Sequence, residues 1–190
     1  VAIGRRGNGK IQIETRDIDT KSPAFIIAEI GNNHNGSLSL AKKLIDEAVR
    51  VGADCAKFQM RDLDTLYRNK GKADDPSVDL GSQYTMDLLS RFQLKNDELF
   101  SAFDYCHEKG IIPLCTPFDR SSLKALESYG LQAYKVASAD FTNHDLLHAL
   151  SRTGKPLICS TGMSTEQEVR HGIEFLKEHN TSYILLHCNS

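Results

Sequence analysis

The sequence predicts an α/β fold built on parallel strands, and three observations lead to this prediction. Short apolar segments rich in β-branched residues alternate with longer segments of helical periodicity. Glycines follow directly after several of the helical segments, as they do at helix C-caps. The chain of 190 residues is long enough for one domain with a sizeable core. Strict alternation of strands and helices requires crossover connections, and therefore parallel strands.

The predicted elements follow a polar extension, residues 1–24. In it, Lys10–Glu14 alternates between polar and apolar side chains, and we expect it to form one arm of a hairpin that closes the bottom of the fold. The domain proper covers residues 25–190. Its predicted strands are Phe25–Ile30, Asp54–Gln59, Gly110–Cys115, Ala133–Ala137, Pro156–Ser160 and Ser182–Cys188. Its predicted helices are Leu38–Val51, Asn96–Lys109, Arg120–Tyr129, Asn143–Arg152 and Ser164–Glu178.

Two of these segments need comment. The first strand opens with an unbroken apolar run, Phe25 to Ala28, which predicts burial on both faces. A long insert, Met60–Lys95, separates the second strand from the next helix and is polar as far as Gln83. A short helix is expected near Tyr84–Phe92. An insert of this length is typical of a binding loop, with a plain linker as the alternative.

Two parallel architectures fit this order of elements. A doubly wound sheet usually carries a Gly-rich phosphate loop after its first strand, but the segment Gly31–Gly36, GNNHNG, is neither GxGxxG nor a P-loop. A (β/α)8 TIM barrel builds its site from the carboxyl ends of many strands, as the polar strand ends here suggest. A barrel of about 250 residues would need two further strands. We therefore expect the first six strands of a TIM barrel, with an open six-stranded sheet as the alternative.

Composition excludes several classes of function. The net charge of −2 argues against a nucleic-acid partner. No apolar run approaches the roughly 20 residues that span a membrane, and the start of the sequence lacks the apolar region of a signal peptide. A soluble, cytoplasmic protein is expected. Five cysteines without a CxxC pair predict neither a disulfide framework nor a zinc site, and we expect Cys55, Cys115, Cys159 and Cys188 to be buried free thiols.

Polar side chains gather at the carboxyl ends of the predicted strands. They are Glu29, Asn33 and His34 from the first strand, Lys57 and Gln59 from the second, Thr116 from the third, Lys135, Ser138 and Asp140 from the fourth, Ser160 from the fifth, and Asn189 and Ser190 from the sixth. A lysine inside an apolar strand is costly to bury without an anionic partner. Two such lysines among hydroxyl groups predict a site for a small, multiply charged anion, such as a phosphate plus a carboxylate. The alternative for each lysine is a buried ion pair with Glu29 or Asp140.

The two carboxylates are candidates for a general base or for holding substrate hydroxyls. Lysine neighbours are expected to lower the pKa of both Glu29 and Asp140. His34 lies in a Gly/Asn-rich loop and is either a substrate ligand or a turn residue. No complete metal site is expected within this chain.

The sequence also contains, in this order, the motifs AEIGNNHNG, AKFQ, TPFD, KVASAD, STGMS and LHCNS. From about Phe25 to Ser190 it resembles the N-acetylneuraminate (sialic acid) synthases and their legionaminate and pseudaminate relatives. The resemblance implies a TIM barrel that condenses phosphoenolpyruvate with an open-chain N-acetylated amino sugar, N-acetylmannosamine or a 2,4-diacetamido hexose, to give a nonulosonic acid and phosphate. It further implies a manganese or magnesium ion held by histidines beyond residue 190, and a homodimer in which a C-terminal antifreeze-like domain reaches into the partner's site.

Position by position, the resemblance assigns two groups of residues. Phosphoenolpyruvate-binding positions are matched by Lys57, Thr116, Lys135, Ser138, Ser160 and Ser190. Positions that face the sugar or handle protons are matched by Glu29, Gln59 and Asp140. We expect Glu29, Lys57, Lys135 and Asp140 to be catalytic, and Asn33, His34 and Asn189 to join the substrate-binding set. Two positions depart from the family pattern, since Asp140 stands where relatives carry Glu and Ser190 where some carry Asn.

Two alternatives to this function remain. One is an anion-binding homologue or fragment without activity; the chain alone is expected to be inactive, because the metal-binding histidines would lie beyond it. The other is a phosphoenolpyruvate-dependent synthase of the DAHP or Kdo phosphate type. Such an enzyme would need a further basic cluster for a second, phosphorylated substrate, and the motif loops contain none.

Overall fold

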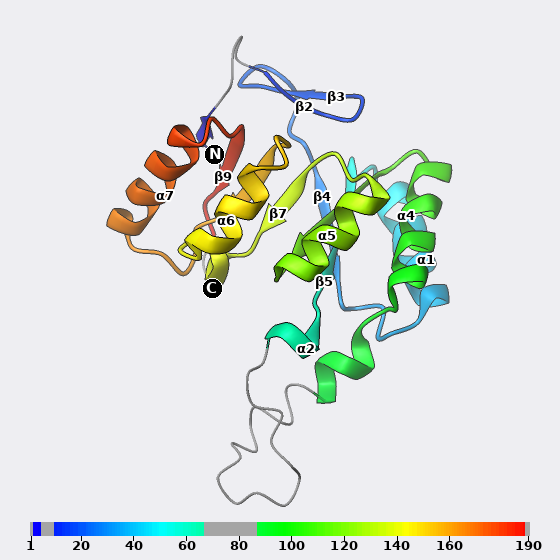
Figure 1. The fold of residues 1–190 in the computed structure, drawn as a ribbon. Helices are drawn as coiled ribbons and strands as arrows, with labels where there is room; N and C mark the ends of the chain where they lie inside the picture. The colour runs from blue at the N-terminus through cyan, green and yellow to red at the C-terminus, as the bar shows by residue number, and fades with distance from the viewer. Residues whose placement is uncertain (1, 5–9, 67–86, 189–190) are drawn as a thin grey trace, which may run out of the picture.

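The computed structural model of the protein describes residues 2–4, 10–66 and 87–188 (Figure 1). It confirms the predicted alternation of strands and helices. The central strands are β4 (Ile27–Gly31), β5 (Cys55–Met60), β6 (Ile112–Pro117), β7 (Tyr134–Val136), β8 (Leu157–Ser160) and β9 (Tyr183–Leu186). The principal helices are α1 (Leu38–Arg50), α4 (Asn96–Glu108), α5 (Arg120–Tyr129), α6 (His144–Ser151) and α7 (Glu166–Glu178).

The central strands are parallel, as the alternation requires. β4, β5 and β6 form one sheet in that order, and β7, β8 and β9 are parallel neighbours in a second sheet. The hydrogen-bonded ladder is divided between β6 and β7, although these two strands lie next to each other. In the first sheet, Lys57 of β5 lies opposite Glu29 of β4, and Gln59 lies opposite Thr116 of β6. The register therefore brings the predicted polar positions of three strands to two successive levels near the carboxyl ends of the strands.

The expectation that the first strand is buried on both faces is wrong. Ile26 is 52% exposed, and Ile27 and Ala28 are only half-buried. The reason is that β4 is an edge strand, hydrogen-bonded to β5 on one side only among the described residues. An apolar run alone does not distinguish a central strand from an edge strand.

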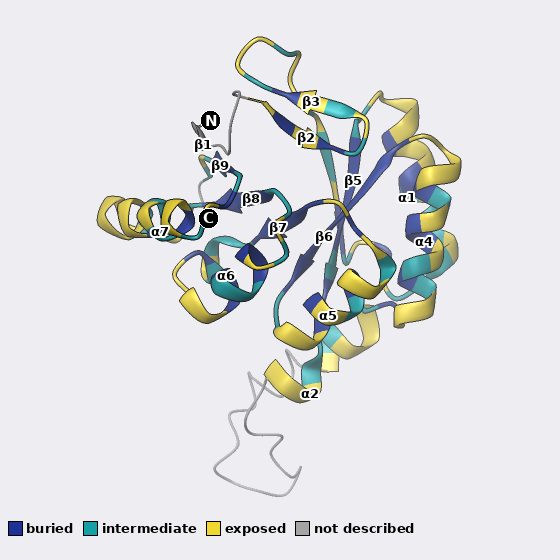
Figure 2. Cartoon of the chain, turned by 45° about the horizontal axis from the view of Figure 1, so that its top comes forward, coloured by how far each residue is buried: buried dark blue, intermediate teal, exposed yellow. Residues whose placement is uncertain are grey.

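Side chains alternate between the two faces of each strand and form two apolar clusters. The outer cluster joins the strands to the helices through residues such as Phe58, Phe103 and Leu126. Figure 2 shows the strands largely buried among helices whose outer surfaces are exposed. The inner cluster is smaller and contains Cys55, Ile112, Leu114, Ala133, Ile158 and Ile184 together with Ile11, Ile13 and Ile18 from the N-terminal segment.

The predicted hairpin is present and supplies these last three isoleucines. β2 (Ile11–Ile13) pairs antiparallel with β3 (Arg16–Ile18). An ion pair of 2.6 Å between Arg16 and Asp54 and a hydrogen bond of 3.0 Å between Glu14 and His107 attach it to the rest of the protein. In Figure 1 the hairpin lies at the opposite end of the molecule from α2 (Leu63–Leu66), which follows β5. The hairpin therefore fills the interior at the amino ends of the strands.

Other features of the termini and the insert follow local sequence rules. β1 (Ala2–Gly4), which the sequence did not predict, pairs antiparallel with β9. Of the short helix predicted within the insert, residues 87–92 are helical, whereas residues 84–86 lie outside the described residues.

α5 is capped by Asp119 and ends at Gly130, whose φ of 98° is the left-handed value that favours glycine. No helix in the described part of the chain combines the length and apolar character needed to span a bilayer.

Candidate active site

The inward-facing side chains change from apolar to polar along the strands. On β5 the inner positions are Cys55, Lys57 and Gln59, because side chains on one face recur every two residues. Cys55 belongs to the inner apolar cluster, and Lys57 stands one step closer to the carboxyl end. On β7 and β8, Lys135 and Ser160 occupy the corresponding region, with Lys135 8% exposed and Lys57 5% exposed. Two buried lysines thus lie above an apolar floor.

Lys57 has a carboxylate on one side and a hydroxyl on the other. Its Nζ lies 2.8 Å from Glu29 Oε2 and donates a hydrogen bond of 3.3 Å to Thr116 Oγ1. These contacts join the ends of β4, β5 and β6. The predicted ion-pair alternative therefore holds for Lys57, although its partner is far from buried, since the Glu29 side chain is 56% exposed.

Lys135 is held by neutral acceptors. Its Nζ donates to Ser160 Oγ at 2.6 Å and to the carbonyl oxygen of Val136 at 2.7 Å. Burial, and after it the positive charge of Lys57, lower the pKa of Lys135 to about 8. The second effect requires that the two ammonium groups be near each other. Within the described residues no carboxylate forms an ion pair with Lys135, so the site carries positive charge that a bound anion would neutralise.

Ser138 and Cys188 extend this polar region. Ser138 Oγ accepts a hydrogen bond of 3.2 Å from the backbone N–H of Gly162, which lies in the loop after β8. Cys188 follows β9 and is half-buried, so the expectation that it is a buried thiol is wrong, whereas Cys55, Cys115 and Cys159 are buried free thiols as expected. Burial acts to raise the pKa of Cys188, but hydrogen bonds from Ser160 and from the Thr161 and Gly162 backbone, with the charge of Lys135, outweigh it and lower the pKa.

Glu29 and Gln59 lie side by side over Gly31. A Cβ atom on Gly31 would lie 3.0 Å from Glu29 Oε1 and 3.3 Å from Gln59 Nε2, and the φ of Gly31 is +51°. Both the space and the backbone conformation therefore favour glycine at this position. Gln59 in turn accepts a hydrogen bond of 2.8 Å from Arg61 Nη2. The sequence reasoning missed Arg61, although it continues the two-residue period of Lys57 and Gln59 beyond the strand.

Asp140 lies in a short 3-10 helix, Ser138–Asp140, after β7. Burial raises its pKa, while a hydrogen bond from Asn143 and the charge of Arg61 oppose this rise. The expectation of a lowered pKa is therefore wrong for Asp140. The cation that acts on it is an arginine rather than one of the two lysines, and it does not outweigh the loss of hydration.

The remaining candidates have different surroundings. His34 is 1% exposed, stacks on Phe58, and accepts a hydrogen bond of 3.2 Å on Nδ1 from the backbone of Gly36. Burial lowers its pKa. These contacts favour the second of the two alternatives, a turn residue. Asn33 is exposed in the same turn, and Asn189 and Ser190 lie outside the described residues.

The described residues do not supply a metal site. Nowhere in ranges 10–66 and 87–188 do three His, Cys, Asp or Glu side chains come together as metal ligands. The polar cluster consists of two ammonium groups, hydroxyls and carboxylates that already have partners. This donor set does not fit a divalent cation.

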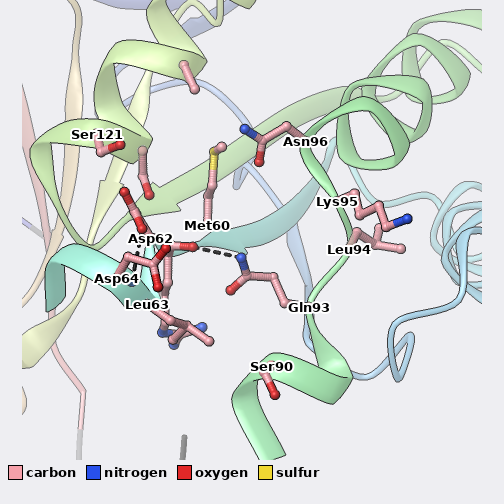
Figure 3. Close-up of a pocket in the computed structure, with 13 residues that line it drawn as sticks. Met60, Asp62, Leu63, Asp64, Ser90, Gln93, Leu94, Lys95, Asn96 and Ser121 are labelled. Carbon is pink, nitrogen blue, oxygen red and sulfur yellow. Dashed lines mark hydrogen bonds between the residues drawn. The ribbon is translucent and has the colours of Figure 1, made fainter. Parts of the chain in front are cut away.

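A separate pocket of about 480 Å³ lies at the carboxyl end of β5 (Figure 3). Its lining comes from the segment after β5 and from the N-terminal ends of α4 and α5, including Asp62, Asp64, Gln93 and Ser121. Arg61 is the described residue that belongs to both regions, since its side chain contacts Gln59 and its backbone carbonyl accepts a hydrogen bond of 2.7 Å from Gln93 Nε2.

Comparison with known proteins gives consistent results. Residues 44–190 match the model of the NeuB family. The N,N'-diacetyllegionaminic acid synthase of Legionella pneumophila is 37% identical over 175 residues, which cover 87% of this chain and 49% of that protein. The pseudaminic acid synthase of Campylobacter jejuni is 31% identical over 179 residues, covering 92% of this chain and 52% of that protein. The chain spans about half the length of the curated relatives it matches.

Solved structures show the same likeness. The crystal structure of the N-acetylneuraminic acid (sialic acid) synthetase from Leptospira borgpetersenii, in complex with citrate, superimposes with a TM-score of 0.84 at 30% identity, covering 95% of this chain and 59% of that one. A truncated 3-deoxy-D-arabino-heptulosonate 7-phosphate synthase from Thermotoga maritima gives a TM-score of 0.65 at 14% identity over 94% of this chain and 55% of that one. The second comparison shows a shared fold alone.

Proposed function

The chain belongs to the NeuB family, and on that premise we propose that it carries the phosphoenolpyruvate-binding part of a nonulosonic acid synthase. The proposed enzyme condenses phosphoenolpyruvate with an N-acetylated amino sugar, N-acetylmannosamine or a 2,4-diacetamido hexose, and releases phosphate. The observation that carries the proposal is the pair of buried lysines, Lys57 and Lys135, surrounded by hydroxyl groups from β6 and β8.

We propose that the strands β4 to β9 are the first six strands of a TIM barrel. In support, a cavity of about 400 Å³ is lined both by Ile27 of β4 and by Ile158 and Ile184 of β8 and β9. The first and last strands therefore face a common interior, which a flat sheet would not allow. Residues 1–24 would form its hairpin extension and residues 25–190 the barrel part.

The lysine cluster suits the two negative ends of phosphoenolpyruvate. Lys135, Ser160 and Ser138, with the backbone N–H groups of Thr161 and Gly162 close by, provide donors for phosphate oxygens. Lys57 and Thr116 provide donors for the carboxylate. Binding in this way replaces the water lost by the two buried ammonium groups with strong, charge-assisted hydrogen bonds.

The reaction requires the sugar on the open side of this cluster. Carbon 3 of phosphoenolpyruvate forms a bond to the aldehyde carbon, the aldehyde oxygen takes up a proton, water adds at carbon 2, and phosphate leaves with cleavage of its C–O bond. Glu29 is more than half exposed and pairs with Lys57, so it lies at the boundary between the two proposed substrates. We propose that Glu29 and Asp140 hold sugar hydroxyls or exchange protons there, with Gln59 as a further ligand.

The raised pKa of Asp140 fits a role in proton exchange. Because burial raises its pKa, the carboxyl of Asp140 is protonated more readily at neutral pH than that of an exposed aspartate. We propose Asn189 and Ser190 as further ligands, on the sequence pattern alone. The divalent manganese or magnesium ion of this proposal would have its ligands beyond residue 190, and the full-length protein would be a cytoplasmic homodimer.

The proposal is tested by phosphate release. Phosphoenolpyruvate, manganese and a panel of acetamido sugars are incubated with this chain and with a longer protein that continues past Ser190. We expect release by the longer protein with at least one acetamido sugar, and none by the chain alone. Release with a phosphorylated aldose and with no acetamido sugar would support a DAHP or Kdo phosphate type of synthase instead. Binding of phosphoenolpyruvate without release by either protein would support an inactive homologue.

A further inference from the structure

Arg61 makes three contacts that fix its position just beyond β5. Its backbone carbonyl accepts a hydrogen bond of 2.7 Å from Gln93 Nε2, which Figure 3 shows pointing toward this segment. Its guanidinium carbon lies 3.8 Å from the centre of the Phe118 ring, a cation–π contact. Its Nη2 donates to Gln59 Oε1 at 2.8 Å. Two of these contacts hold the guanidinium, and the third holds the backbone of the same residue.

The contact with Gln59 determines which way the amide faces. A guanidinium has only donors, so it holds the amide oxygen and not the amide nitrogen. The Gln59 Nε2 group must then face the other side, where it lies against Gly31 next to Glu29 Oε1. A flipped amide would place two oxygens, those of Gln59 and Glu29, against each other, and would turn the NH₂ group toward the arginine. Arg61 thus removes the ambiguity that an isolated glutamine would have.

Arg61 also acts on Asp140, from a different strand end. Among the described residues, the groups identified as acting on the Asp140 carboxyl are Asn143, from its own loop, and Arg61, from the segment after β5. Both favour the ionised form, against the effect of burial. Arg61 therefore donates to Gln59, and its charge favours the ionised form of Asp140; the proposed function assigns both residues to the sugar-facing side.

We propose that Arg61 is the positioning residue of the sugar-facing side: it fixes Gln59 with its N–H groups toward the space beside Glu29. This inference rests on the proposed function for the identity of the ligand. The fixed N–H groups of Gln59 require a hydrogen-bond acceptor, so the group recognised is a sugar oxygen such as the aldehyde or acetamido carbonyl oxygen. Glu29 beside it requires a donor, which a hydroxyl supplies.

The test compares Arg61→Met and Arg61→Lys with the control Arg120→Met. Arg120 is an exposed arginine whose partner is Asp145, so its removal deletes an arginine from the surface without touching the site. Nuclear magnetic resonance follows the Gln59 side-chain amide and the titration of the Asp140 carboxyl, neither of which depends on turnover. In Arg61→Met we expect the Gln59 amide resonances to shift and to exchange faster with solvent, and the Asp140 titration to move to higher pH. Arg61→Lys retains the charge but not the planar fork, so it should restore the Asp140 titration and not the Gln59 amide.

A kinetic measurement on the longer protein completes the test. Arg61→Met should raise the KM for the sugar about tenfold or more, the size of one charged hydrogen bond, and leave the affinity for phosphoenolpyruvate within about twofold. The inference is overturned if the Asp140 titration and the Gln59 amide resonances of Arg61→Met are the same as in the wild type. It is also overturned if the KM of Arg61→Met for the sugar equals that of Arg120→Met. If the resonances respond to Arg61→Met but the wild-type protein shows no turnover with any sugar, the positioning role stands and the proposed function fails.

Discussion

Lys57 and Glu29 form an ion pair of 2.8 Å in which the two partners differ sharply in exposure, with the lysine side chain 6% and the glutamate side chain 56% exposed. The carboxylate lies at the mouth of the site and the ammonium lies inside it. A fully buried ion pair would be a closed unit with little reason to bind anything else. Here the buried cation is only partly neutralised, and the second buried cation, Lys135, has hydroxyl and carbonyl partners.

The first prediction concerns Lys135. Replacing it with alanine removes a charged donor from the proposed phosphate site, so Lys135→Ala should weaken phosphoenolpyruvate binding by about 1.5–3 kcal/mol, roughly 10- to 150-fold. Isothermal titration calorimetry measures the dissociation constant. Lys124→Ala, on the exposed side of α5, is the control and should bind as the wild type does. An unchanged constant for Lys135→Ala would exclude this lysine from the site.

The second prediction concerns pH. The pKa of Lys135 is lowered to about 8 by burial and by Lys57, and the proposed complex needs its charged form. Above pH 8 the free site has lost this proton, so binding an anion must take a proton up again. Affinity for phosphoenolpyruvate should then fall by about tenfold per pH unit above 8, and level off below it. In Lys135→Met this dependence should disappear between pH 7 and 9, whereas an equally steep dependence in the variant would assign it to another group.

The third prediction concerns Gly31. Gly31→Ala introduces a Cβ against Glu29 and Gln59 at a positive φ, whereas Gly52→Ala has the same type of backbone conformation with no atom within 4 Å. Each variant should lose about 1–2 kcal/mol of unfolding free energy from backbone strain, measured by denaturant titration. Only Gly31→Ala should also change ligand affinity, because it alone displaces Glu29 from Lys57. Equal ligand affinity in the two variants would show that the contact over Gly31 is unimportant for binding.

The fourth prediction concerns the cysteines. Burial raises the pKa of Cys106, Cys115 and Cys159 to about 12, whereas the hydrogen bonds and the charge around Cys188 lower its pKa. Since the thiolate is the reactive form, iodoacetamide should alkylate Cys188 first in the native protein. Mass spectrometry identifies the labelled residue. Phosphoenolpyruvate should slow the reaction by occupying the neighbouring Ser160 and Lys135, and Cys188→Ser should remain unlabelled at early times. Early labelling of Cys115 would contradict the assigned burial.

Much of the fold was predictable because its periodicities are strong. Alternation of apolar strands with amphipathic helices gave the order of β4 to β9 and of the main helices, and the short alternating segment after Lys10 gave the hairpin. The neighbourhood of Lys57 and Lys135 was also predictable, since parallel strands bring their carboxyl ends to one edge. The pairing of β1 with β9 was not, because three residues without a distinct pattern carry no information about a distant partner.

The errors at the site have a common origin. The pKa of Asp140, the exposure of Cys188 and the role of Arg61 depend on which side chains meet after the chain has folded, and neighbours along the sequence do not reveal this. Arg61 continues the two-residue period of Lys57 and Gln59, but it follows the last residue of β5 and lies outside the predicted strand, so it was not considered with them. The sequence left His34 open between two roles, and its burial and its stacking on Phe58 favour the turn residue.

The hairpin that fills the amino ends of the strands also has a kinetic consequence. Its isoleucines share one apolar cluster with Ile184 of β9, so residues near the two ends of the sequence must meet before that cluster is complete. Contacts between such distant parts of a chain raise the relative contact order and slow the search for the native state. The inner apolar cluster beneath the lysines is therefore expected to be among the last parts of the domain to form during folding, after the local strand–helix units.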